Sequence, residues 1–215
     1  MPGFGMLQDG FDDGVVDPVL WSQSYGDPVE AGGRARVPCT TGFAGFRSAS
    51  VYSLSWSQVA LRAYPPEPGG ASTAALSLLV LSDVGGTDAG FLIDRAQSAM
   101  GLYSRVGYAD GGALFPAYDP VAHAWLRLRE AGGSLFWEAS PDGSAWTVLR
   151  TAVSPAWVSQ SNLSWLMESH RDSGTDNFGE VDNLNISRAG GLSASARTVA
   201  GLSSYARVGS TLSGG

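Results

Sequence analysis

The stretch that decides the fold is Trp125-Leu-Arg-Leu-Arg-Glu-Ala-Gly-Gly-Ser-Leu-Phe-Trp-Glu-Ala-Ser-Pro-Asp-Gly-Ser-Ala-Trp-Thr-Val-Leu-Arg150. Leu126 and Leu128 alternate with Arg127 and Arg129, so an extended chain places the two kinds of side chain on opposite faces. An Asp-Gly pair between two such runs is a strong hairpin signal, and the earlier Gly-Gly pair permits the positive φ angles of another turn. The stretch therefore predicts a three-stranded antiparallel meander with the leucines in the core.

The rest of the chain repeats this pattern, because short alternating runs are separated by Gly and Pro clusters and helical periodicity is nearly absent. Beside the meander, strands are predicted over residues 31–37, 52–63, 74–82, 90–94, 102–106, 162–170 and 180–187. Four tryptophans in apolar alternating runs are predicted to be core residues, namely Trp56, Trp137, Trp146 and Trp165. We expect an all-β protein, a two-sheet antiparallel jelly-roll sandwich.

The composition limits the partners and the compartment. The chain of 215 residues carries a net charge of −7, and all 13 basic residues are arginines, as a GC-rich genome favours. Scattered acidic residues argue against nucleic acid or an anionic membrane as a partner. No charged and then apolar leader opens the chain, and its longest apolar stretch is too short to cross a bilayer. We expect synthesis in the cytoplasm, no membrane insertion, and a buried structural thiol at Cys39.

The chain divides into three predicted segments. Residues 1–8 form a short N-terminal anchor segment, residues 9–188 form the sandwich, and residues 189–215 form a C-terminal extended arm rich in Gly and Ser. A decamer occurs twice in this arm, beginning Gly191-Leu-Ser and Gly201-Leu-Ser. The arm is either a linker or an assembly element that orders on a partner. The residues expected to act in assembly are Leu192, Arg197, Leu202, Tyr205 and Arg207.

A resemblance to a known family rests on a string of short motifs in the same region. They are Tyr118-Asp-Pro120, His123-Ala-Trp-Leu-Arg-Leu-Arg-Glu130, Leu135-Phe-Trp-Glu-Ala-Ser-Pro-Asp-Gly143, the opening Phe11-Asp-Asp13 with Trp21, and the closing Val181-Asp-Asn-Leu-Asn-Ile186. Together they resemble concanavalin A-like (laminin-G-like) jelly rolls, which occur in actinobacterial proteins and in minor tail proteins of actinobacteriophages. The resemblance covers about residues 9–188.

This resemblance, the absence of Lys and the missing leader favour a non-catalytic structural component of a phage virion. We expect a minor tail or accessory protein, not an enzyme, that is made in the host cytoplasm and located in the phage tail. Its expected partners are other virion proteins and further copies of itself, with a trimer favoured. A decoration protein on the phage head would have much the same sequence features.

The main alternative is a carbohydrate-binding module that recognises host cell-wall glycans. Its expected platform is Trp125 with Arg127 and Arg129 on an exposed sheet face, together with Trp157 in a loop. A glycoside hydrolase is a third hypothesis, but the sequence lacks the Glu-x-Asp-x-x-Glu motif of jelly-roll glucanases, and Glu138 stands alone on its strand. No catalytic residue is therefore predicted, and His123 and His170 are expected to have surface or structural roles.

Calcium is the one cofactor considered. The first and last strands of such a sandwich lie together, which would bring Asp12 or Asp13 near Asp182. Related lectin-like domains often hold a structural calcium with such acids, since calcium takes six to eight oxygen ligands. The alternative is a solvated acidic loop without a metal.

Overall fold

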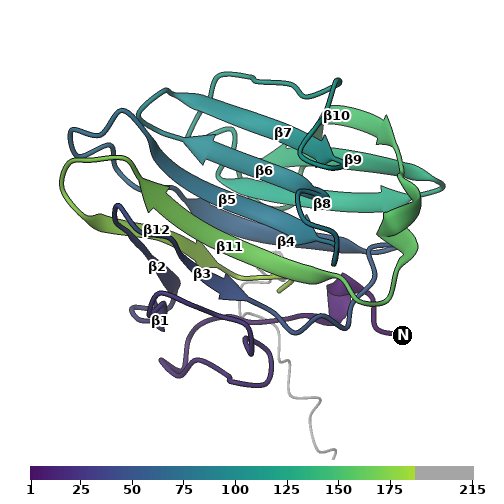
Figure 1. Cartoon of the computed structure of the whole chain (residues 1–215), viewed down its shortest axis with the longest axis horizontal. Coiled ribbons are helices and arrows are strands. Elements are labelled where there is room, and N and C mark those ends of the chain that lie inside the picture. The colour runs from purple at the N-terminus through teal and green to yellow at the C-terminus, as the bar shows by residue number, and fades with distance from the viewer. Residues whose placement is uncertain (187–215) are drawn as a thin grey trace, which may run out of the picture.

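Two antiparallel sheets pack face to face in the computed structural model, which describes residues 1–186. In Figure 1 the five-stranded sheet lies in front, in the order β3 (Ala44–Arg47), β11 (Ser164–Arg171), β5 (Ala74–Leu81), β6 (Asp88–Asp94) and β7 (Ala99–Arg105). Behind it lies the seven-stranded sheet, in the order β1 (Val29–Glu30), β2 (Ala35–Cys39), β12 (Asn177–Asp182), β4 (Gln58–Tyr64), β8 (Trp125–Ala131), β9 (Ser134–Ser140) and β10 (Thr147–Val153). The predicted jelly-roll sandwich is confirmed.

The predicted strands all form, including the meander of β8, β9 and β10. Its register pairs Leu128 with Trp137 and Leu126 with Ala139, which brings the apolar side chains of both strands to one face. Sequence reasoning missed two short strands, β1 and β3. The other regular elements are the 3-10 helices η1 (Phe4–Met6) and η2 (Ala156–Ser159), and the described chain has no helix long and apolar enough to span a membrane.

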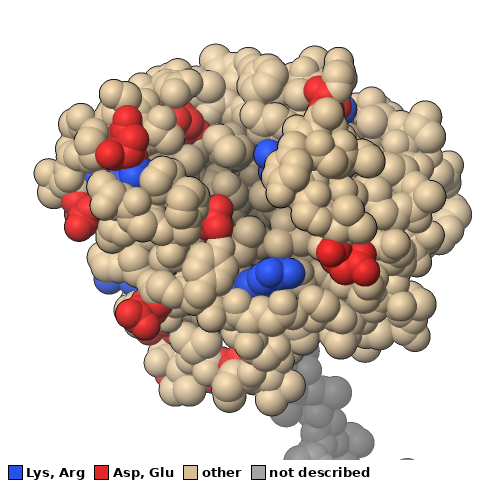
Figure 2. All heavy atoms as spheres, viewed as in Figure 1, with Lys and Arg blue, Asp and Glu red and all other residues tan. Residues whose placement is uncertain are grey.

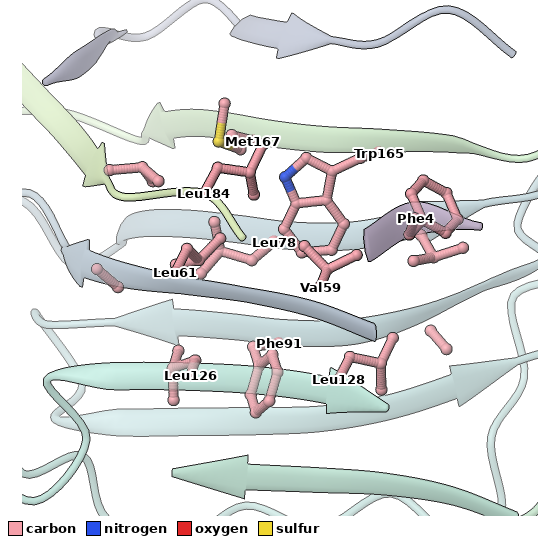
Figure 3. Close-up of a cluster of buried hydrophobic side chains, with 14 of the residues drawn as sticks. Phe4, Val59, Leu61, Leu78, Phe91, Leu126, Leu128, Trp165, Met167 and Leu184 are labelled. Carbon is pink, nitrogen blue, oxygen red and sulfur yellow. The ribbon is translucent and has the colours of Figure 1, made fainter. Parts of the chain in front are cut away.

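The core lies between the sheets and is filled by their inward-facing rows. Figure 3 shows Trp165 and Met167 of β11 with Leu78 of β5, facing Leu61 of β4 and Leu126 of β8. All five side chains are buried. At about 25 cal/mol per Å² of buried apolar surface, such a continuous core is the main source of the domain's stability.

The tryptophans divide differently from the prediction. Trp137 and Trp165 are core residues as predicted, but Trp56 is 77% exposed, which corrects its assignment to the core. Trp56 has a φ of +52° in the turn before β4, so the alternation of its neighbours does not extend to it. Trp146 is half-buried, with its ring 4.2 Å from the Arg127 guanidinium carbon. Cys39 is fully buried, as expected of a structural thiol.

The N-terminal residues pack into the sandwich beside its last strand. Phe4 and Leu7 are fully buried. The Asn185 side-chain amide donates to the backbone oxygens of both residues, at 2.8 and 2.9 Å. Asp9 pairs with Leu184 through the backbone, so the opening and closing segments lie together as predicted. The three-segment division stays a prediction, and the arm lies outside the described residues.

Candidate functional site

A groove of about 270 Å³ lies over the outer face of the five-stranded sheet. Across its floor one register row contains Gly45, Glu168, Ser77, Leu92 and Gly101, from β3 to β7. Glu168 is the one long polar side chain in this row of small and apolar residues, which leaves open space beside its carboxylate. Figure 2 shows this face: it is hollowed near its centre, most of its surface is uncharged, and charged side chains of both signs are scattered over it.

Tyr25 closes one end of the row. Its backbone pairs with Gly45 through two hydrogen bonds, of 3.0 and 2.9 Å, which adds Tyr25 to the edge of β3. The phenol ring then lies over Gly45, where a Cβ would come within 3.1 Å of it, and its hydroxyl donates a hydrogen bond to Glu168. Burial raises the Tyr25 pKa, and the bond to Glu168 and its charge raise it further, against the opposing effect of Arg47. Tyr25 is therefore a protonated donor at neutral pH.

Tyr103 closes the other end in a similar way. Its ring lies over Gly101, where a Cβ would clash with the ring atoms, and Phe115 meets it edge-on at 5.6 Å between centroids. Arg105 lies beside the Tyr103 ring and forms two bonds of 2.8 and 2.9 Å to the buried Asp88. The register row thus has a tyrosine ring over the glycine at each end, and a side chain at either position would meet that ring.

Two of the polar groups that line the groove come from β11. Glu168 and His170 occupy alternate positions on this strand and so face the same side. The His170 ring stacks on the exposed Phe43 ring at 4.2 Å between centroids, and its Nδ1 lies 3.3 Å from the Gly42 carbonyl oxygen. Among the described residues that line the groove, Glu168 is the single carboxylate. Sequence reasoning assigned His170 a structural role and missed Tyr25, Phe43 and Glu168.

The residues predicted to bind glycans lie elsewhere. Trp125 is 4% exposed because the turn at Gly143 covers its ring, and Trp157 is also buried. Arg127 and Arg129 face outward on the seven-stranded sheet, but both form ion pairs with the same carboxylate, that of Glu138, at 2.6 and 2.9 Å. These placements argue against an open aromatic platform here.

Glu138 itself does not have the environment of a catalytic acid. Burial raises its pKa, but the hydrogen bonds from Arg129 and Arg127 and their positive charges outweigh burial and lower it. A carboxyl held ionised between two guanidiniums cannot supply a proton at neutral pH. His123 is likewise structural, since its Nδ1 accepts the backbone N–H of Asp119 at 3.0 Å.

The acids expected to bind calcium lie in one neighbourhood. Asp12 and Asp13 are exposed, and Asp182 is half-buried, with a pKa raised by burial and by the charge of Asp12. Glu30, buried nearby, has a pKa raised to about 7 by burial and by Asp9 and Asp13. Among residues 1–186, however, no three His, Cys, Asp or Glu side chains are gathered closely enough to hold a metal ion. The calcium site stays a prediction.

The predicted assembly residues Leu192, Arg197, Leu202, Tyr205 and Arg207 lie outside the described part.

Comparison with known proteins finds the fold in glycan-processing enzymes. No family model and no curated protein matches the sequence. The catalytic domain of an endo-1,3-beta-glucanase (laminarinase) from Thermotoga petrophila RKU-1 matches with a TM-score of 0.57 and 14% identity, over 82% of this chain and 94% of that chain. A laminarinase from Flavobacterium sp. UMI-01 matches at 0.59 and 8%, over 82% and 96%. Crh5 transglycosylase in complex with NAG matches at 0.56 and 11%, over 86% and 84%.

These matches confirm the concanavalin A-like fold and correct two functional predictions. The expected non-catalytic phage virion component, a minor tail or accessory protein, is contradicted, because the proteins that share the fold are glucanases and a transglycosylase. The expectation that the chain is not an enzyme is contradicted by the same finding. At these low identities the likeness itself establishes the fold, and the activity is a matter for proposal.

Proposed function

We propose that this chain is a glycan-active enzyme, which binds a polysaccharide in the groove over the five-stranded sheet and cleaves or transfers a glycosidic bond there. One observation carries the proposal. Glu168 and His170 lie at alternate positions on β11 and line the groove beside Phe43, and a neutral hydroxyl, that of Tyr25, is bonded to the Glu168 carboxylate. A concave site with convergent polar groups is the usual location of an active site.

The two titratable side chains can divide the proton transfers. Glu168 would accept the proton of a water, or of an acceptor sugar's hydroxyl, as that oxygen bonds to the anomeric carbon. The glycosidic C–O bond breaks, and protonated His170 would give its proton to the leaving oxygen. Water as acceptor gives hydrolysis and a sugar as acceptor gives transglycosylation. Tyr25 would act as a positioning residue that fixes the orientation of Glu168.

The walls of the groove suit a sugar chain. Phe43, which lines the groove, is 60% exposed, so its ring is accessible to an apolar sugar face. The laminarinases that share the fold support β-1,3-glucan as the first substrate to test, and a lichenase among the similar structures supports β-1,3-1,4-glucan as the second. Most glycoside hydrolases use a pair of carboxyl groups, one of which protonates the leaving oxygen. In this groove Glu168 would be one member of the pair, and His170 would take the place of the other.

The test measures new reducing ends released from laminarin and lichenan by the wild-type chain and by Glu168→Gln. The substitution keeps an oxygen for the Tyr25 hydroxyl but removes the base, so we expect a loss of about 10²–10⁴-fold in kcat. Asp176→Asn, an exposed carboxyl in the loop between β11 and β12, is the charge-matched control and should retain full activity. Wild-type protein that releases no reducing ends and forms no transfer products, or Glu168→Gln that cleaves as well as wild type, would overturn the proposal.

The role of Tyr25 has its own test. Tyr25→Phe removes the hydroxyl and keeps the ring over Gly45, so KM should be retained while kcat falls. An unchanged kcat would show that Tyr25 does not position Glu168. Homo-oligomerisation and the function of the arm stay predictions, which light scattering on the full chain and on a chain ending at residue 187 would check.

A further inference from the structure

A second groove, of about 420 Å³, lies on the opposite side of the sandwich, over the outer face of the seven-stranded sheet. It shares no lining residue with the groove of the proposed function. Four arginines line it, from the turn before β2, from β2 itself, from β4 and from the turn after β6, together with two tyrosines: Arg34, Arg36, Arg62, Arg95, Tyr64 and Tyr118. Four guanidiniums in one groove are notable in a chain whose net charge is −7.

Aromatic rings hold three of these guanidiniums in place. The guanidinium carbons of Arg34 and Arg62 lie 3.7 and 5.0 Å from the Tyr64 ring centroid. That of Arg36 lies 4.3 Å from the Phe178 centroid. A guanidinium that rests on a ring uses its face for this contact and keeps its edge N–H groups for oxygen acceptors. Because guanidiniums cover the Tyr64 and Phe178 rings, less aromatic surface is left on which a nucleobase could stack.

The positive charge of the groove is only partly neutralised. Glu180 is shared by Arg34 and Arg36, with N–O distances of 2.6 and 2.7 Å, and Arg95 pairs with Glu67. Within the described residues Arg62 forms no ion pair, although Asp182 stands opposite it in the register. Two carboxylates against four guanidiniums leave an excess of two positive charges among the lining residues.

A fifth arginine, Arg171, does not line the groove but is bonded to two residues that do. Arg171 is fully buried and donates to the Glu67 backbone oxygen at 2.7 Å and to the Asn177 side-chain oxygen at 3.2 Å. Both of these residues line the groove. The Nε and Nη1 atoms of Arg171 have no hydrogen-bond partner within residues 1–186, and no carboxylate is paired with it. A buried cation without a counter-ion is costly, so a bound anion nearby would stabilise the protein.

The groove also offers a donor suited to a hydroxyl group. Tyr118 is half-buried, and its hydroxyl makes no hydrogen bond within the described chain. The volume lies within the range of small-molecule sites, and it would accommodate one or two sugar rings. Guanidinium forks match the planar carboxylate and the phosphate group, while a phenol hydroxyl matches a sugar hydroxyl.

We propose that this groove binds an anionic sugar, whose carboxylate or phosphate is held by Arg62 with Arg34 and whose hydroxyl bonds to Tyr118. Uronates and sugar phosphates share this chemistry. The site is independent of the proposed catalytic groove, so either proposal can fail without the other.

Isothermal titration calorimetry at low salt tests the proposal with three matched probes: glucuronate, glucose 6-phosphate and glucose. We expect one or both anionic sugars to bind, glucose not to bind, and affinity to fall as NaCl is added. Arg62→Gln should weaken binding by about tenfold, and Arg62→Lys, which keeps the charge but loses the fork, should have an intermediate affinity. The two anionic probes decide between carboxylate and phosphate. Equal binding of glucose, or full affinity in Arg62→Gln, would overturn the proposal.

Tyr118→Phe separates a sugar site from an ion site. The substitution should weaken the binding of glucose 6-phosphate or glucuronate and leave the binding of inorganic phosphate unchanged. If inorganic phosphate binds as tightly as glucose 6-phosphate to wild type, the groove is an ion site only and the sugar proposal is wrong. Should Arg62→Gln fail to fold, Arg34→Gln gives the same measurement, because Glu180 keeps its ion pair with Arg36 when Arg34 is replaced.

Discussion

Arg150 on β10 is the best residue with which to test how the loop after β7 is held to the sandwich. Its guanidinium forms bonds of 2.7 and 3.0 Å to the Asp110 carboxylate and donates to the Leu102 backbone oxygen at 2.6 Å. It also lies 4.6 Å from the Trp137 ring centroid. Both charged side chains are nearly inaccessible, at 6% and 7% exposure. Asp110 in turn accepts the Ser104 backbone N–H at 2.6 Å, so the pair joins β10, β7 and the loop.

Arg150→Met tests this arrangement, because methionine fills much of the volume and makes none of the polar bonds. Breaking a buried pair by removing one partner typically costs 3–5 kcal/mol, since the other charge is left buried and unpaired. We expect Arg150→Met to lower the free energy of unfolding by about 3–5 kcal/mol, measured by urea denaturation at pH 7. The double variant Arg150→Met with Asp110→Leu should recover part of this loss, because it leaves no buried charge.

The same pair predicts a pH dependence. Burial raises the Asp110 pKa, but hydrogen bonds from Arg150, Ser104 and Gly112 outweigh burial and lower it. A lowered pKa in the folded state means that the pair's contribution is present above the pKa of the unfolded chain and is lost as the pH falls through the folded-state value. The difference in stability between wild type and Arg150→Met should therefore shrink below about pH 4. A loss under 1 kcal/mol at pH 7, or a difference that does not change with pH, would refute this account.

Three further predictions concern single sites. Gly90→Ala should destabilise the fold by more than about 3 kcal/mol in chemical denaturation, because a Cβ would clash with the Leu78 carbonyl oxygen, whereas Gly111→Ala, which has open space around it, should be nearly neutral. Cys39 should react with a thiol reagent only after denaturant is added, since it is fully buried; fast labelling of the native chain would contradict its placement. If calcium binds the acids near Asp182, adding it should raise the Tm and EDTA should lower it; an unchanged Tm in both would rule out the calcium prediction.

The sequence predicted the strands well because their alternation is local. In the meander of residues 125–150, leucine and arginine alternate over a short distance, and the Asp-Gly turn fixes the register. The strand β3 was missed because its four residues, Ala44-Gly-Phe-Arg47, include a glycine, which weakens strand propensity. A side chain at Gly45 would meet the Tyr25 ring, which lies over it. This contact joins residues 20 positions apart, so the sequence around β3 does not reveal it.

Exposure was harder to predict than secondary structure. Trp125 alternates with the leucines and so was placed on an open face, and it does point away from the core. It is buried nevertheless, because the turn at Gly143, which belongs to another strand pair, folds over its ring. Period-two alternation indicates which face a side chain occupies, but the cover over that face depends on loops that are distant in sequence.

The candidate site depends on such distant contacts even more strongly. Tyr25 and Glu168 are separated by 143 positions, and only the order of strands β3, β11 and β5 brings them together. The one local signal was Glu168-Ser-His170, two titratable side chains at alternate strand positions. This signal is weak alone, since many surface strands carry such pairs.

What a carboxylate can do in this protein depends on its partners rather than on its place in a motif. Glu138 lies on a strand that the sequence predicted well, but two guanidiniums hold it ionised, so its role is to pair with Arg127 and Arg129 on the sheet. Glu180 is shared by two arginines and contributes to a groove suited to anions. Glu168 is bonded to a neutral phenol, lines the groove over the five-stranded sheet and, within residues 1–186, forms no ion pair with an arginine, which is why the proposed function assigns the proton transfer to it. A search for paired carboxylates along the sequence cannot separate these cases, because the partners that decide between them come from other strands.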